Sequence, residues 1–301
     1  MSYPYLTDIS NALFGTHWHL AVPNFGVIVA IAVVAATVVA TRLVRSYEVL
    51  GRLPPRTHAL VTDMVLVSTL AGIVGARIFD IFDNLDRFLA NPLSMIFTRA
   101  GFSIYGGLCF GIVAGVIFVK RRSLPVIPML DAAAPALMLG YGIGRLGCQV
   151  AGDGDWGTAA NVVLKPSWLP HWLWAQTYDG NIAGVIISPP GVYPTPIYEF
   201  LMALGICWVL WRLRFRVHRA GYLFSVYLLL AGFERLLIEK IRINTRYEVF
   251  GAYITQAEAI SFLLVIAGLV GVLATLRDKR FWTKVVVSAG VLAALSACAP
   301  H

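Results

Sequence analysis

Charged residues are scarce in this 301-residue chain, where they make up only 13% of the sequence. A soluble globular domain carries roughly 25% charged residues. Hydrophobic residues reach 58% of the chain, and its mean hydropathy is +0.74. This balance excludes a soluble domain and a disordered chain, and it is typical of a protein with several membrane-spanning helices.

Cysteine is also rare, and its spacing shows no zinc or disulfide pattern. The four cysteines form no CxxC pair and have no histidine at zinc-ligand spacing; they are Cys109, Cys148, Cys207 and Cys298. A disulfide framework or a zinc centre depends on such spacing. We therefore expect neither a disulfide framework nor a metal site.

The first 21 residues contain no lysine or arginine. A cleavable signal peptide has basic residues before its apolar run, and the run that begins at residue 22 is about twice the usual length, so we expect no cleavage there. The segment 1–21 instead carries aromatic residues at helix-like spacing, namely Tyr3, Tyr5, Phe14 and Trp18. We predict that this segment lies at the membrane interface.

Seven apolar segments are long enough to cross a bilayer, which takes about 20 helical residues. They cover residues 22–42, 58–83, 103–119, 126–146, 196–211, 221–241 and 254–276. The predicted fold class is an all-α integral membrane protein with seven transmembrane helices. An eighth run, 285–298, has only fourteen residues, and it spans the membrane, lies at the interface or stays unfolded.

The net charge of +8 comes from basic clusters between the apolar runs, so we expect no nucleic-acid partner. Fifteen lysines and arginines follow the first, third, fifth and seventh segments, whereas six lie in the alternate connections. Because basic loops stay in the cytoplasm, this asymmetry predicts that the N-terminus lies outside. The chain then comprises an interfacial segment (1–21), four helices (22–146), an external loop rich in glycine and tryptophan (147–195), three helices (196–276) and a basic segment with a short apolar tail (277–301).

Three arginines fall inside the apolar segments or at their ends: Arg77, Arg145 and Arg235. An arginine at the centre of a bilayer costs at least about 2.5–3.5 kcal/mol, so such residues are functional candidates. The alternative is an arginine that extends to the headgroups. For Arg77, a simple pair with Asp80 three residues later is equally good.

A glycine-rich stretch, GRLGCQVAGDGDWG, covers residues 144–157 at the predicted outer end of the fourth segment. Five glycines in fourteen residues let a ligand approach the backbone closely. The arginine fork at position 145 can hold a phosphate with two parallel hydrogen bonds. The combination predicts an anion pocket at the lipid interface that suits a phospholipid headgroup.

This stretch resembles the signature of the prolipoprotein diacylglyceryl transferase family. Other blocks agree in order over residues 20–276: Gly75-Ala76-Arg77-Ile78, Ser103-Ile104-Tyr105-Gly106-Gly107-Leu108, Asp131 with Pro135, Tyr193-Pro194-Thr195-Pro196-Ile197-Tyr198-Glu199, and Glu234-Arg235 with Glu239 and Arg242. The resemblance implies an enzyme of the bacterial inner membrane with its active site near the outer face. Such an enzyme transfers the diacylglyceryl group of phosphatidylglycerol to the lipobox cysteine thiol of a prolipoprotein, the first step of lipoprotein maturation, without a cofactor.

The resemblance also implies the residues of the site. The catalytic candidates are Arg145, Arg235 and Tyr105. The substrate-binding candidates are Arg77, Gly106, Gly107, Gly144, Gly147, Gln149, Asp153, Asp155, Tyr198, Glu199 and Glu239. For Tyr198 and Glu199, helix capping after two prolines is an equally good explanation.

Several positions depart from the family pattern. Tyr105 stands where the family has a histidine, a candidate base for the thiol, and Tyr193 also replaces a histidine. A phenol with an ordinary pKa near 10 is a poor base at neutral pH. The alternative function is therefore a non-catalytic relative or a transporter that binds an anionic lipid or solute through the same arginines.

The C-terminal end imitates the substrate of that family. Basic residues at 277–284 precede an apolar stretch that ends in Leu295-Ser296-Ala297-Cys298. We hypothesise that Cys298 can be lipidated, whereas the alternative is a terminal helix with an accidental small-residue end. An intact mass without a diacylglyceryl adduct on Cys298 would contradict the hypothesis.

Overall fold

The computed structural model describes residues 2–18, 20, 22–97, 103–215, 219–249 and 252–277. The chain forms two compact units, one from residues 1–39 and 133–276 and the other around residues 40–132. The basic segment and tail that follow residue 277, including Cys298, lie outside the described residues.

The first unit holds most of the helices. Its elements are α1 (Leu6–Phe14), the start of α2 (Asn24–Val49), most of α7 (Val126–Ala151), α8 (Thr195–Leu213), α9 (Tyr222–Glu239) and α10 (Gln256–Arg277). Two short 3-10 helices, η2 (Val162–Leu164) and η3 (His171–Leu173), lie between α7 and α8. An antiparallel hairpin of β1 (Arg246–Val249) and β2 (Ala252–Thr255) joins α9 to α10.

Each of the seven predicted segments contains a helix, and the helical membrane class is confirmed in this coarse form. In the described part of the chain, six helices are long and apolar enough to cross a membrane: α2, the helix over Thr57–Asp83, α6 (Ile104–Arg121), α7, α8 and α10. The seventh, α9, has 18 residues. It carries the charged side chains of Glu234, Arg235 and Glu239.

Small residues let the helices of the first unit approach closely. A Cβ built on Gly142 of α7 would lie 2.9 Å from the Ala203 Cβ of α8. A Cβ on Gly232 of α9 would lie 2.8 Å from the Ser261 carbonyl oxygen of α10. Close approach of this kind stabilises helix pairs in lipid, where hydrophobic burial supplies little driving force.

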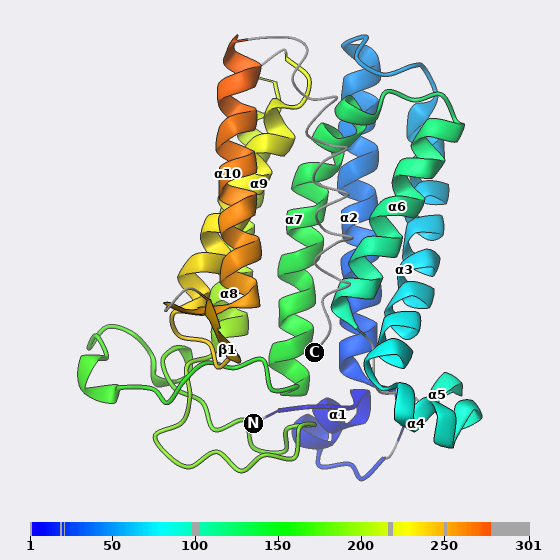
Figure 1. Ribbon diagram of the computed structural model, residues 1–301. Helices are drawn as coiled ribbons and strands as arrows, with labels where there is room; N and C mark the ends of the chain where they lie inside the picture. The colour runs from blue at the N-terminus through cyan, green and yellow to red at the C-terminus, as the bar shows by residue number, and fades with distance from the viewer. Residues whose placement is uncertain are drawn as a thin grey trace. The chain divides into compact units, whose positions relative to one another are not determined.

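The second unit contains the remaining elements: η1 (Thr57–Leu60), α3 (Val61–Asp83), α4 (Leu85–Ala90), α5 (Pro92–Phe97) and α6. Helices α3 and α6 run side by side (Figure 1). They meet at glycines, since a Cβ on Gly106 would clash with the Gly75 carbonyl oxygen.

The glycine-rich stretch differs from its expected form, because α7 continues to Ala151, five residues beyond the predicted end. Gly144 and Gly147 are therefore helical, and left-handed backbone begins only at Gly152, with a φ of 62°. The helix extends because its terminal amides still have backbone partners, such as the Gly152 N–H that donates to the Cys148 carbonyl.

The connection after α7 is ordered by backbone hydrogen bonds and a small core. Val192 exchanges two hydrogen bonds with Gln176, and Val192 also packs with Trp156 and Tyr178. Burial raises the pKa of the Tyr178 phenol above its ordinary value. The long loop is therefore a folded element that can hold side chains against the ends of α7 and α8.

Candidate functional site

Glu199 of α8 is the centre of a buried charge cluster. Its side chain is 0% exposed, and three arginines surround it. Arg235 Nη1 and Arg242 Nη1 lie 3.2 Å and 3.3 Å from Glu199 Oε1. Arg145 Nε lies 3.4 Å from Oε2, an ion-pair distance without good hydrogen-bond geometry. Arg145 and Arg235 thus meet at one carboxylate although 90 positions separate them in the sequence.

Asp155 links two of these arginines across the loop. One of its carboxylate oxygens accepts a hydrogen bond from Arg145, and the other accepts one from Arg242. The Thr195 hydroxyl donates to the Asp155 carbonyl at 2.7 Å, which ties the loop to the start of α8. Arg145, Arg242 and the two carboxylates therefore form a closed ring of charges.

Local sequence explains how these groups meet. Pro194 and Pro196 flank the first residue of α8, and proline favours a helix start because its fixed φ matches the helix. Gly157 allows the loop to touch the chain after α9, since a Cβ there would lie 2.6 Å from the Ile241 carbonyl oxygen. The neighbouring Thr158 N–H donates to that carbonyl at 2.7 Å, so Arg242 is held beside the loop.

Tyr141 adds a hydroxyl to the cluster. Its Oη lies 3.1 Å from Glu199 Oε1 and 3.3 Å from Glu234 Oε1. The Arg145 guanidinium carbon sits 5.1 Å from the centre of the Tyr141 ring, within cation-π range. One phenol therefore contacts an arginine and two carboxylates from three helices.

Glu239 holds Arg235 from the other side. Arg235 Nη2 lies 2.9 Å from Glu239 Oε2, one helical turn away, and the side chain of Glu239 is 1% exposed. The Asn244 amide donates to Glu239 Oε1 at 2.6 Å. The predicted binding residues Asp155, Glu199 and Glu239 all contact arginines of the cluster.

Other predicted residues of this unit lie around the loop rather than at the charges. The side-chain oxygen of Gln149 accepts a hydrogen bond from the Tyr178 hydroxyl at 2.7 Å. The side-chain amide nitrogen of Gln149 donates to the side-chain oxygen of Gln176 at 2.8 Å. The Tyr198 hydroxyl donates to the Leu173 carbonyl at 2.7 Å. These contacts fasten the loop to α7 and α8.

Asp153 accepts a hydrogen bond from the Asp155 N–H at 3.3 Å. A ligand atom of each of these residues and the Cys148 sulfur lie within 4.8 Å of one another, as metal ligands can. Because Asp155 already pairs with Arg145 and Arg242, a cation there would compete with two guanidinium groups. This geometry therefore favours arginine binding over metal binding at Asp155.

Four predicted residues belong to the second unit. Arg77 Nη1 lies 3.3 Å from Asp80 Oδ2, the simple i,i+3 pair that the sequence allows. Gly106 and Gly107 face α3, with Gly106 in the tighter contact. Tyr105 is 41% exposed on α6.

Tyr141, Glu234 and Arg242 belong to this cluster but were not among the predicted site residues. Glu234 and Arg242 do occur in a block that matches the family pattern. Arg242 follows the apolar part of its segment, so its charge fits a loop as well as a site. Tyr141 precedes Arg145 by one helical turn, and that spacing alone places the two side chains on one face.

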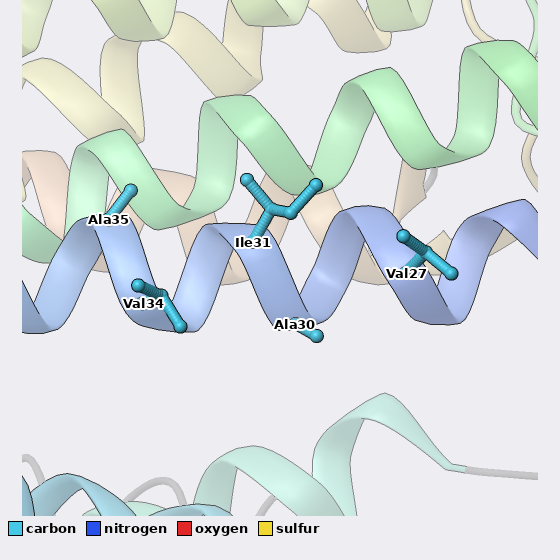
Figure 2. Close-up of a pocket in the computed structure, with 5 residues that line it drawn as sticks. All are labelled: Val27, Ala30, Ile31, Val34 and Ala35. Atoms are coloured by element: carbon cyan, nitrogen blue, oxygen red, sulfur yellow. The ribbon is translucent and has the colours of Figure 1, made fainter.

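A separate apolar hollow of about 380 Å³ lies on α2, lined by Val27, Ala30, Ile31, Val34 and Ala35 (Figure 2). All five side chains come from one helix, and none is polar. The hollow can accommodate hydrocarbon, but it offers no group for acid, base or anion chemistry.

Comparison with known proteins bears directly on this cluster. Residues 12–274 match the family model described as prolipoprotein diacylglyceryl transferase. The phosphatidylglycerol–prolipoprotein diacylglyceryl transferase of Shouchella clausii is 29% identical over 257 residues, covering 85% of this chain and 86% of the relative. The transferase of the same name from Clostridium tetani is 26% identical and covers 85% of this chain and 93% of its own length. The match begins before α2, ends within α10 and includes every residue of the charge cluster, so the chain belongs to the prolipoprotein diacylglyceryl transferase family.

Proposed function

We propose that this protein transfers the diacylglyceryl group of phosphatidylglycerol to the lipobox cysteine of prolipoproteins. Its relatives carry the name of that activity. The proposal rests on one observation: Arg145, Arg235 and Arg242 all contact the carboxylate of the buried Glu199.

The chemistry needs positive charge at the leaving group. The thiolate sulfur attacks the glyceryl carbon, a C–S bond forms, and the C–O bond to phosphate breaks. Glycerol phosphate departs with the bonding electrons, so negative charge grows on its oxygen. Pre-placed guanidinium groups stabilise such charge strongly in a site with little water.

The carboxylates of the cluster serve to hold the arginines in place. Arg145 and Arg242 each contact both Asp155 and Glu199, and Arg235 contacts both Glu199 and Glu239. A guanidinium has five N–H donors, more than these contacts engage among the described residues. Each arginine can therefore bind a phosphate while its carboxylate partners fix its orientation.

The remaining assignments extend this proposal. Arg77, Gly106 and Gly107 contribute to substrate binding, and Tyr105 orients the substrate. Gly144, where an added Cβ would meet nothing within 4 Å, leaves space for the lipid, and Gly147 contributes to substrate binding where α7 packs against Phe25. Gln149, Asp153 and Tyr198 support the loop over the lipid. The protein is a multi-pass membrane protein, and we place its N-terminus and this site on the outer side of the bacterial inner membrane.

The test uses membranes that contain the full chain, labelled phosphatidylglycerol and a lipobox peptide. We expect thioether product from the wild type and a loss of about 100-fold or more for Arg145→Ala and Arg235→Ala, because each removes a charge that stabilises the leaving group. Arg45→Ala, which removes an exposed arginine of α2, is the matched control and should leave the rate unchanged. Binding of phosphatidylglycerol by the wild type without any product would contradict the proposal.

A further inference from the structure

Glu234 of α9 is a buried carboxylate that the arginine chemistry above does not use. The residue is 3% exposed. Within the described part of the chain, no lysine or arginine nitrogen lies within 4.0 Å of its carboxylate, whereas Glu199 has three arginines at that range. The two carboxylates therefore have different partners although they share one neighbour.

That shared neighbour is the Tyr141 hydroxyl, which lies 3.3 Å from Glu234 Oε1 and 3.1 Å from Glu199 Oε1. A phenol has a single proton to donate and lone pairs that can accept another. It can donate its proton to one carboxylate and accept a proton from a third group. Tyr141 is thus placed to pass a proton rather than only to fill space.

The partners decide which carboxylate can take that proton. Three guanidinium groups surround Glu199 and balance its charge. A buried carboxylate without a cationic partner is costly to keep charged, because little water solvates it. A proton passed through Tyr141 therefore goes to Glu234.

We propose that Tyr141 and Glu234 carry the proton of the substrate thiol during the transfer reaction, an inference that rests on the proposed function. The thiol gives its proton to Tyr141 Oη while Tyr141 passes its own proton to Glu234 Oε1. The resulting thiolate forms the C–S bond, and the C–O bond breaks with its electrons on the phosphate. Glu234 then returns the proton through Tyr141 to the departing phosphate or to water, so the enzyme keeps no net proton.

Tyr141 and Glu234 together supply the base for the substrate thiol, a role for which Tyr105 is a poor candidate. Glu234 is next to Arg235 in the sequence, and Tyr141 lies against Arg145. The proton carrier and the charges that stabilise the leaving group are therefore parts of one cluster.

The experiment compares two acceptor peptides with the full-length protein in nanodiscs that contain phosphatidylglycerol. One peptide has the lipobox cysteine, and the other has selenocysteine, whose selenol is ionised at neutral pH. With the cysteine peptide, we expect Glu234→Gln to lower kcat by about 10²–10⁴-fold, the usual contribution of a general base. With the selenocysteine peptide, the deficit should shrink by at least about tenfold, because no proton has to be removed. Tyr141→Phe should show the same pattern with a smaller loss.

Two variants on the exposed hairpin serve as matched controls, Glu248→Gln and Tyr247→Phe, and both should behave as the wild type. Glu234→Asp keeps a carboxylate and should recover part of the rate, while the phosphatidylglycerol that co-purifies with each variant measures whether the site is intact. A rate for Glu234→Gln within about threefold of the wild type overturns the inference. Equal losses with both peptides, or a loss of bound lipid in step with the rate, also overturn it. A wild type that forms no thioether overturns the proposed function itself, which separates the two failures.

Discussion

Glu199 shows how one residue can organise a site. A carboxylate with no exposure inside apolar helices is stable only when cations and hydrogen bonds balance its charge. Arg145, Arg235 and Arg242 supply those cations, and Glu199 in turn keeps three like charges close together. The stability of this region and the readiness of the arginines to bind phosphate therefore depend on the same side chain.

We predict that Glu199→Gln destabilises the protein. The substitution leaves three guanidinium groups, whose side chains are only 10–21% exposed, without their common counter-charge. Breaking a buried ion pair costs roughly 3–5 kcal/mol. Thermal unfolding in detergent, followed by tryptophan fluorescence, should show a clearly lower midpoint. Glu248→Gln, on the exposed hairpin, should leave the midpoint unchanged. Equal midpoints for Glu199→Gln and the wild type would show that the three arginines do not need this charge.

At the scale of elements, the pairing of α3 with α6 depends on glycine positions that face each other. Gly75 and Gly106 bring the two backbones together, because a Cβ on either would lie under 3.0 Å from the carbonyl oxygen of the other. Gly107 is different, since a Cβ there would meet the Ala76 Cβ at 3.5 Å, an ordinary contact. The sequence resemblance assigns both Gly106 and Gly107 to substrate binding, whereas the structure gives Gly106 a packing contact as well.

The pair Gly106→Ala and Gly107→Ala tests this difference. Gly106→Ala forces the backbones of α3 and α6 apart, and overpacking of this kind costs about 1–3 kcal/mol. Gly107→Ala adds the same methyl group where space exists, so its unfolding midpoint should match that of the wild type. Both midpoints come from thermal unfolding in detergent. If the two variants were equally stable, close helix approach would not be the reason for glycine at position 106.

For the whole molecule, the distribution of basic residues predicts the orientation in the membrane. Fifteen lysines and arginines lie on the predicted cytoplasmic side, and six lie in the alternate connections. Six described helices are long and apolar enough to span. Whether the chain crosses a seventh time depends on α9, whose charged residues point to protein partners such as Glu199 rather than to lipid.

Labelling of single cysteines in intact cells tests both the orientation and the crossing by α9. We place cysteines at three exposed positions in a background without the native cysteines: Leu50→Cys, Ile186→Cys and Ile243→Cys. A maleimide that cannot cross membranes should label positions 186 and 243 directly and position 50 only after permeabilisation. Labelling of position 50 in intact cells would reverse the orientation, and protection of position 243 would show that α9 does not cross.

The order of apolar segments, their helical state and the family could all be predicted from the sequence, because membrane helices depend on local composition and the motifs occur in a fixed order. The tertiary structure alone decided that Tyr141, Asp155 and Arg242 join Arg145, Arg235 and Glu199, since these groups come from three separate stretches of chain. A hydropathy profile cannot predict these contacts, because a charged residue with a buried partner and a charged residue at a helix end can have the same local sequence. The extension of α7 to Ala151 and the hairpin after α9 were missed for a related reason. Both depend on backbone partners that only the folded chain supplies.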